Sequence, residues 1–103
     1  MKTLISVIIV AYKSQKFINP CIDSIIKSAK FAKVRIEVII VVNDKENTDY
    51  KFPKNCSIII NNKNFGYAKG LNIGAKIAKA EWLLIANPDT KTSLETIKNL
   101  ITH

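Results

Sequence analysis

Two long apolar runs constrain the fold of this chain more than any other feature. Leu4 to Val10 and Ile36 to Val42 are rich in β-branched residues and almost continuously hydrophobic, which is typical of strands covered on both faces in a parallel sheet. Between the two runs, an apolar stripe at helical spacing predicts an amphipathic helix through Ile18, Ile22, Ile25 and Ala29. We interpret the first run as the central strand of a sheet.

The second half of the chain repeats this alternation. Ser57 to Ile60 and Trp82 to Ala86 predict two further strands. A helix is predicted between them by the apolar positions Tyr67, Leu71, Ala75 and Ala78. Thr92 to Glu95 fits a capping box that would start a last helix, whose apolar face would comprise Leu94, Ile97 and Ile101. The alternation predicts an α/β fold of Rossmann-like type, with a mostly parallel sheet and helices on both faces in three layers.

Length and composition indicate one folded unit. A chain of 103 residues is long enough for one domain but not comfortably for two. Its hydrophobic fraction of 48% and charged fraction of 23% are ordinary for a globular protein. We therefore expect a single domain over residues 1–103.

The formal net charge of +8 comes almost wholly from lysine, because Arg35 is the only arginine. Arginine is favoured for reading bases and phosphates, and the sequence carries no recognised nucleic-acid-binding motif, so we expect no nucleic-acid partner. The lysines can simply solvate the surface. The alternative is that their field attracts nucleotide diphosphates or an anionic membrane surface, which would allow peripheral membrane association.

The two cysteines, Cys21 and Cys56, form no C-x-x-C pair, which argues against a metal or redox motif. Two packed, reduced thiols are the simpler interpretation.

No segment approaches the roughly 20 apolar residues that span a bilayer, and the run from Leu4 to Ala11 does not match a signal peptide. We therefore expect a cytoplasmic protein, either free or at the cytoplasmic face of the membrane.

Polar loops follow the predicted strands. Asp44 comes just after the second strand, and Asn87 to Asp89 come directly after the fourth. Because the carboxyl ends of parallel strands meet at one edge of the sheet, these loops can contact one ligand. Asp44 can bind a ribose or base there, and Asp89 can hold Mg²⁺ or Mn²⁺ on a phosphate. For both residues the alternative is an acidic side chain that only stabilises a turn.

Small and polar residues surround the start of the predicted helix after the third strand. The spacing of Gly66, Gly70 and Gly74 matches neither a G-x-G-x-x-G fingerprint nor a Walker loop. Close packing of helix on sheet explains Gly74. It explains Asn64 and Asn72 less well, so these side chains are candidates for a binding edge.

Taken together, several short motifs in a fixed order cover nearly the whole chain. They are Ser6-Val-Ile-Ile-Val-Ala-Tyr12, Cys21-Ile-Asp-Ser-Ile25, Glu37-Val-Ile-Ile-Val-Val42 with Asp44 and Thr48-Asp49, Asn64-Phe-Gly-Tyr-Ala68 with Asn72-Ile-Gly74, and Asn87-Pro-Asp89. In this order and spacing the chain resembles the amino-terminal, nucleotide-sugar-binding half of glycosyltransferase family 2, inverting enzymes of the GT-A fold. Asn-Pro-Asp in place of Asp-x-Asp is most similar to the rhamnosyltransferase-like branch.

The resemblance implies a role for each candidate residue. The residues that it assigns to nucleotide binding are Ala11, Tyr12, Asp44, Asn64, Gly66, Lys69, Asn72 and Asn87. It places the nucleobase against the backbone at Ala11 and Tyr12. The base or ribose would contact Asp44, and the ribose would face Asn87. Asn64, Gly66 and Asn72 would shape the diphosphate and sugar edge. Lys69 would add positive charge near the phosphates, and Asp89 would coordinate Mg or Mn.

The resemblance also implies partners and a larger protein. The expected partners are a UDP- or dTDP-linked sugar and an acceptor glycan or lipid-linked sugar, as in cell-surface polysaccharide biosynthesis. Lys13 stands where the family often has Asn, and Asp44-Lys45-Glu46-Asn47 departs from the usual Asp-Asn-x-Ser. The family carries its acceptor site and catalytic base in a second half, and no catalytic residue is assigned here. We therefore expect the amino-terminal part of a longer enzyme, with an apolar face prone to self-association; the alternative is a non-catalytic interaction or regulatory domain.

Overall fold

Strand β1 (Ile5–Ala11) lies at the centre of a four-stranded sheet and is buried along its whole length. In the computed structural model, which describes residues 3–44 and 50–102, it pairs in parallel with β2 (Ile36–Val42) and with β4 (Trp82–Ala86). Strand β3 (Cys56–Ile60) extends the sheet beyond β2, giving the order β3-β2-β1-β4. Every strand pair is parallel, which confirms the predicted α/β class.

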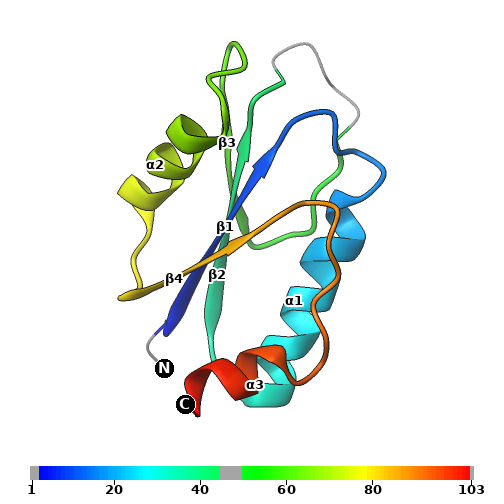
Figure 1. Cartoon of the computed structure of the whole chain (residues 1–103), viewed down its shortest axis with the longest axis vertical. Coiled ribbons are helices and arrows are strands. Elements are labelled where there is room, and N and C mark those ends of the chain that lie inside the picture. The colour runs from blue at the N-terminus through cyan, green and yellow to red at the C-terminus, as the bar shows by residue number, and fades with distance from the viewer. Residues whose placement is uncertain (1–2, 45–49, 103) are drawn as a thin grey trace.

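Helices cover both faces of the sheet, as Figure 1 shows. Helix α1 (Ile18–Ala32) and the short α3 (Thr96–Ile101) lie on one face, and α2 (Tyr67–Ile77) lies on the other. The three-layer arrangement is the one that the alternating sequence pattern predicted. Among the described residues, no helix has the length and hydropathy needed to cross a membrane.

The larger part of the core lies between the sheet and α1. Alternate residues of β1 and β2 point to this side and pack on the apolar stripe of α1, where Ile18, Ile22 and Ile25 are at most 1% exposed. Fully burying an isoleucine side chain contributes roughly 1.5–3 kcal/mol. The predicted stripe is thus the buried face of α1, and Cys21 beside it is also buried.

Two glycines allow α2 to lie close to the opposite face. A Cβ atom added at Gly70 would lie 2.8 Å from Val10 Cγ1, and one added at Gly74 would lie 2.8 Å from Ile8 Cγ2. Real Cβ atoms do not approach other atoms so closely, so the helix could not sit here with larger residues without a shift. The structure therefore confirms that Gly74 serves helix packing.

Two polar side chains of the sheet, the buried Ser6 and the partly buried Glu37, hold the connection between α2 and β4. The hydroxyl of Ser6 on β1 donates to Glu37 Oε2 at 2.5 Å and accepts the backbone N–H of Ala80 at 3.1 Å. Glu37 Oε2 also accepts the N–H of Lys79 at 2.5 Å. A connection with few apolar side chains is therefore held by hydrogen bonds to the sheet beneath it.

The predicted capping box is wrong. Helix α3 begins at Thr96 rather than near Thr92, and it has no side-chain cap of its own. Instead, Ser28 of α1, which is fully buried, accepts the N–H of Ile97 and donates to the carbonyl of Leu94, both at 3.1 Å. Because α1 supplies the partner for this helix end, no local cap is needed.

Candidate functional site

Four loops emerge at the carboxyl edge of the sheet, because all four strands run in the same direction. Strand β1 ends at Ala11, one residue later than the apolar run from Leu4 to Val10 predicted. Ala11 is the last residue of the strand and pairs with Val42, and its carbonyl accepts the N–H of Asn43 at 2.8 Å. Asn43, the first residue after β2, is therefore anchored directly to the sheet.

Asp44, which follows β2, is held by two donors from other parts of the chain. The residue is only 7% exposed. The Oδ2 atom accepts the backbone N–H of Lys13 at 2.7 Å and the hydroxyl of Tyr50 at 3.2 Å. Lys13 reaches it with a φ of 53°, in the left-handed region that non-glycine residues seldom occupy. A charge-assisted hydrogen bond offsets part of the cost of that conformation.

Tyr50 connects the loops after β1 and β2. Its hydroxyl accepts the N–H of Ser14 at 2.9 Å while donating to Asp44. The ring is stacked on Phe52 with centroids 5.2 Å apart. Burial raises the pKa of the Tyr50 hydroxyl above its usual 10.0, and the charge of Asp44 raises that pKa further. Tyr50 therefore remains a donor throughout the physiological pH range.

A second network starts at Asn43, which is only 2% exposed. Its side-chain oxygen accepts from Asn61 Nδ2 at 2.6 Å, and its Nδ2 donates to the carbonyl of Gly66 at 3.2 Å. Gly66 in turn donates its N–H to Asn64 Oδ1 at 2.9 Å and has a φ of 86°. The ends of β2 and β3 are thus joined to Gly66, the residue that directly precedes α2.

The turn after β4 is more open. The carbonyl of Asn87 accepts the Thr90 hydroxyl at 2.8 Å and the Cys21 thiol at 3.3 Å. The side-chain oxygen of Asn87 accepts from the hydroxyl of Tyr67 at 3.4 Å. Asp89 is exposed. Burial raises the pKa of the Cys21 thiol above its usual 9.0, and the negative charge of Asp89 raises it as well.

The structure brings most, but not all, of the predicted site residues to this edge. Hydrogen bonds link the ends of β1 and β2 through Asp44, and the start of α2 to the end of β4 through Asn87. Asn72 lies on the side of α2 opposite Gly70, which faces the sheet, and is exposed. Lys69 lies beside it in a shallow hollow of about 500 Å³, with its ammonium 4.4 Å from the ring centre of Phe65.

Sequence reasoning missed Asn43, Asn61 and Tyr50 as members of the site. A buried Asn directly after a buried strand could have identified the first, because such a side chain needs internal partners. Tyr50 lies only six residues from Asp44, but its other partner, Ser14, is 36 residues away, and no local pattern indicates that the two loops meet. Thr48 and Asp49, which belong to the sequence motif, lie outside the described residues.

A divalent cation could use Asp89, but this residue would need further ligands. Within the described residues, no three His, Cys, Asp or Glu side chains come close enough together to hold a metal ion. Mg²⁺ and Mn²⁺ commonly take one or two carboxylates and complete their shell with water and substrate phosphates. One exposed carboxylate at a strand end fits that requirement only when a phosphate-bearing ligand is present.

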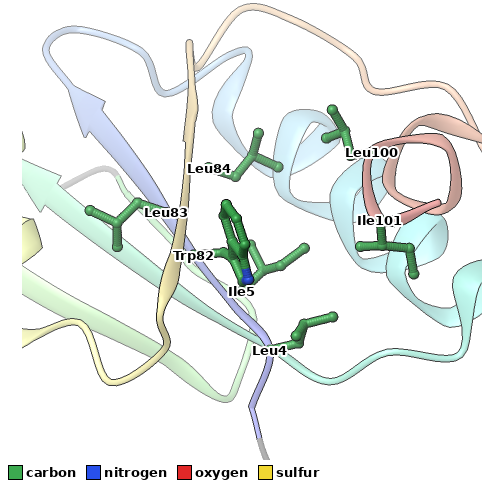
Figure 2. Close-up of a pocket in the computed structure, with 7 residues that line it drawn as sticks. All are labelled: Leu4, Ile5, Trp82, Leu83, Leu84, Leu100 and Ile101. Carbon is green, nitrogen blue, oxygen red and sulfur yellow. The ribbon is translucent and has the colours of Figure 1, made fainter. Parts of the chain in front are cut away.

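A separate apolar hollow of about 320 Å³ lies at the opposite edge of the sheet, between β4 and α3 (Figure 2). Its lining residues are Leu4, Ile5, Trp82, Leu83, Leu84, Leu100 and Ile101. None of these side chains can act as an acid or a base, and the only polar side-chain atom among them is the indole nitrogen of Trp82. We therefore take the carboxyl edge, rather than this hollow, as the candidate functional site.

Residues 6–103 match the family model described as "Glycosyl transferase family 2". Because this match covers nearly the whole chain, the protein belongs to glycosyltransferase family 2. No curated protein gives a significant match.

Solved structures show the same fold. The chain matches S. aureus TarS 1-349 with a TM-score of 0.78 and 24% identity, over 97% of this chain and 32% of that one. The structure of TarS 1-349 in complex with UDP gives the same TM-score and identity, over 97% and 31%. The longer TarS structure matches with a TM-score of 0.77 and 24% identity, over 97% and 19%. The chain thus spans about a third or less of these proteins and shares the GT-A fold in that part.

Proposed function

We propose that this domain binds a nucleoside-diphosphate sugar at the carboxyl edge of its sheet and serves as the donor-binding part of an inverting glycosyltransferase. Family membership supports the reaction class. The observation that carries the proposal is the arrangement of Asp44, a buried acceptor held between two loops, at the same sheet edge as the exposed Asp89. TarS, which shares the fold, has been solved with UDP bound.

The nucleoside would bind at the ends of β1 and β2. Asp44 offers a carboxylate to a base N–H or a ribose hydroxyl, and both of these groups are donors. Tyr12 lies beside it with its side chain 46% exposed, and it can border the base together with the backbone at Ala11. A uracil or thymine ring carries an imide N–H, so UDP- and dTDP-linked sugars both suit a carboxylate acceptor.

The diphosphate would lie toward β4 and the start of α2. Asn64 and Gly66 shape the turn into α2, and Asn87 would face the ribose. Asp89 would hold Mg²⁺ or Mn²⁺ together with the phosphates. When bound, such a cation supplies positive charge that stabilises the leaving nucleoside diphosphate. Lys69 and Asn72 would act at the outer edge of this region, where the lysine adds positive charge.

Transfer would proceed by displacement at the anomeric carbon, with an acceptor hydroxyl as the nucleophile. Such a step needs a base that takes the proton of the hydroxyl. We expect another part of the enzyme to supply that base and to bind the acceptor glycan or lipid-linked sugar.

Asn87-Pro88-Asp89 favours the rhamnosyltransferase-like branch of the family. The net charge of +8 would favour binding at an anionic membrane face.

Calorimetric titration with UDP and dTDP, with and without Mn²⁺, tests the proposal. Wild type should bind at least one nucleotide more tightly with Mn²⁺, and Asp89→Ala should lose the increase that the metal provides. Asp23→Ala removes an exposed carboxylate on the outer side of α1 and is the matched control that should behave as wild type. If folded wild type binds neither nucleotide, the proposal is wrong and the interaction-domain alternative becomes the better one.

A further inference from the structure

We propose that Tyr50 is a positioning residue of the donor site, whose hydroxyl fixes the Asp44 carboxylate for contact with the nucleoside. This inference rests on the proposed function. Both hydrogen bonds that described residues donate to the carboxylate end on Oδ2. Two donors on one oxygen restrict rotation of the carboxylate, so the other oxygen has a defined direction.

The position of the Tyr50 hydroxyl is set by groups outside the donor site. Its ring is stacked on Phe52 at an interplanar angle of 15°, and both rings pack against the main core. The next residue, Lys51, is tied to α1, because its carbonyl accepts from Asn19 Nδ2 at 2.5 Å. The hydroxyl is therefore held by core and helix contacts, and it can orient Asp44 rather than follow it.

The hydroxyl also matches the needs of two neighbouring loops at once. It accepts the Ser14 N–H at 2.9 Å and donates to Asp44 at 3.2 Å. A phenol is the one uncharged aromatic side chain that can both accept and donate through a single oxygen. Phenylalanine would keep the ring and its packing, but it would remove the acceptor of the Ser14 N–H and one of the two donors to Asp44 Oδ2, leaving the Lys13 N–H as the other.

The experiment compares Tyr50→Phe with Ser28→Ala. Ser28 is a matched control, because its buried hydroxyl also accepts one backbone N–H, that of Ile97, and donates one hydrogen bond, to the carbonyl of Leu94, but these bonds join α1 to the start of α3. The probes are UDP, uridine, and pyrophosphate with Mn²⁺, titrated calorimetrically below the melting temperature of each variant. Uridine reports on the nucleoside end of the site alone, and pyrophosphate reports on the metal end.

Tyr50→Phe should weaken uridine and UDP about ten-fold while pyrophosphate binding stays within about two-fold of wild type. Ser28→Ala should lower the melting temperature by about as much as Tyr50→Phe does, but it should leave the affinities for all three probes unchanged. The inference is overturned if Tyr50→Phe binds uridine as wild type does. It is also overturned if the variant loses pyrophosphate and uridine binding equally, since that result indicates general loss of structure.

A second readout does not depend on nucleotide binding. Hydrogen exchange of the Lys13 amide, which donates to the same Asp44 oxygen, should be about ten-fold faster in Tyr50→Phe and unchanged in Ser28→Ala. If wild type binds no probe, the proposed function fails, and this rate alone decides whether Tyr50 positions Asp44. An unchanged rate would overturn the inference.

Discussion

The two halves of the carboxyl edge differ in how firmly the protein holds them. At the end of β2, Asn43 and Asp44 are buried and bonded to three other segments. At the end of β4, Asp89 is exposed, in a turn held mainly through the carbonyl of Asn87. Under the proposed function, this contrast means that the nucleoside end would be formed before the ligand arrives, whereas the metal end would depend on the ligand to complete it.

The largest expected difference between the two halves of the carboxyl edge is in the effect on stability of replacing Asp44 or Asp89. Asp44→Ala leaves the Lys13 N–H and the Tyr50 hydroxyl without an acceptor, so we expect a loss of about 2–3 kcal/mol in the free energy of unfolding. Asp89→Ala should change it by less than about 0.5 kcal/mol, since the side chain is exposed. Urea denaturation measures both. Asp44→Asn, which keeps an acceptor, should lose less than Asp44→Ala; equal stability of Asp44→Ala and Asp89→Ala would contradict the contrast.

Two glycine substitutions in α2 test whether the Asn43 network contributes to the candidate site. Gly70→Ala and Gly74→Ala each place a Cβ atom 2.8 Å from a β1 side chain, and overpacking of this kind costs roughly 1–3 kcal/mol, partly offset by about 1 kcal/mol of helix propensity. We expect similar decreases in melting temperature. Only at Gly70 does the new atom also approach Asn43 Nδ2, at 3.3 Å.

Nucleotide affinity should therefore separate these two variants. Gly70→Ala should weaken UDP binding several-fold by displacing Asn43 from Gly66, whereas Gly74→Ala should bind as wild type does. Identical affinities in a titration of both variants would show that the Asn43 network plays no part in the site.

The outer edge of β4 gives a further prediction. Among the described residues, no strand pairs with that edge, and Trp82, Leu83 and Ile85 are 65%, 47% and 51% exposed. Uncovered apolar edge strands promote pairing between chains. We expect concentration-dependent association in analytical ultracentrifugation, and Leu83→Lys should reduce it. Ser57→Lys, on the opposite edge strand β3, is the control; a wild type that stays monomeric at high concentration would contradict the expectation.

The smallest expected effect is on the pH dependence of stability. Burial and Asp89 raise the pKa of the Cys21 thiol above its usual 9.0, so the fold favours the neutral thiol. That contribution is complete below pH 9 and is lost as the pH rises through the folded-state pKa. Cys21→Ser keeps a donor for Asn87 but has no group that titrates there. Its unfolding free energy should therefore decline less between neutral and alkaline pH than that of wild type.

The strands and helices that are encoded by a local hydrophobic pattern could be predicted from the sequence. The bounds of β2 and β4 coincide with their apolar runs, and the stripe of α1 is its buried face. The predicted start of the last helix was wrong, because the residue that completes it, Ser28, lies on α1. The bond between Ser14 and Tyr50, which are 36 residues apart, was missed for the same physical reason. Hydrogen bonds between distant segments leave no periodic signal in the sequence.

Within the candidate site, the sequence pattern showed which residues lie at the ends of strands, but it did not show which way every side chain points. Asp44 and Asn87 were chosen because they follow strands, and the parallel sheet brings them to one edge. Asn72 was chosen for its place in a motif, but helical geometry turns it away from the sheet side on which Gly70 lies. A helix position depends on its angle as well as on its distance along the chain.

The strand order has a consequence for the way this domain folds. Ile5 pairs with Ile36 on one side and with Trp82 on the other, so the second pairing closes a far longer loop and has a greater entropic cost. We expect β1, β2 and β3 to associate first and β4 to join late. The nucleoside end would then exist in a folding intermediate that still lacks the metal end, and a nascent chain would acquire Asp89 as the last part of its donor site.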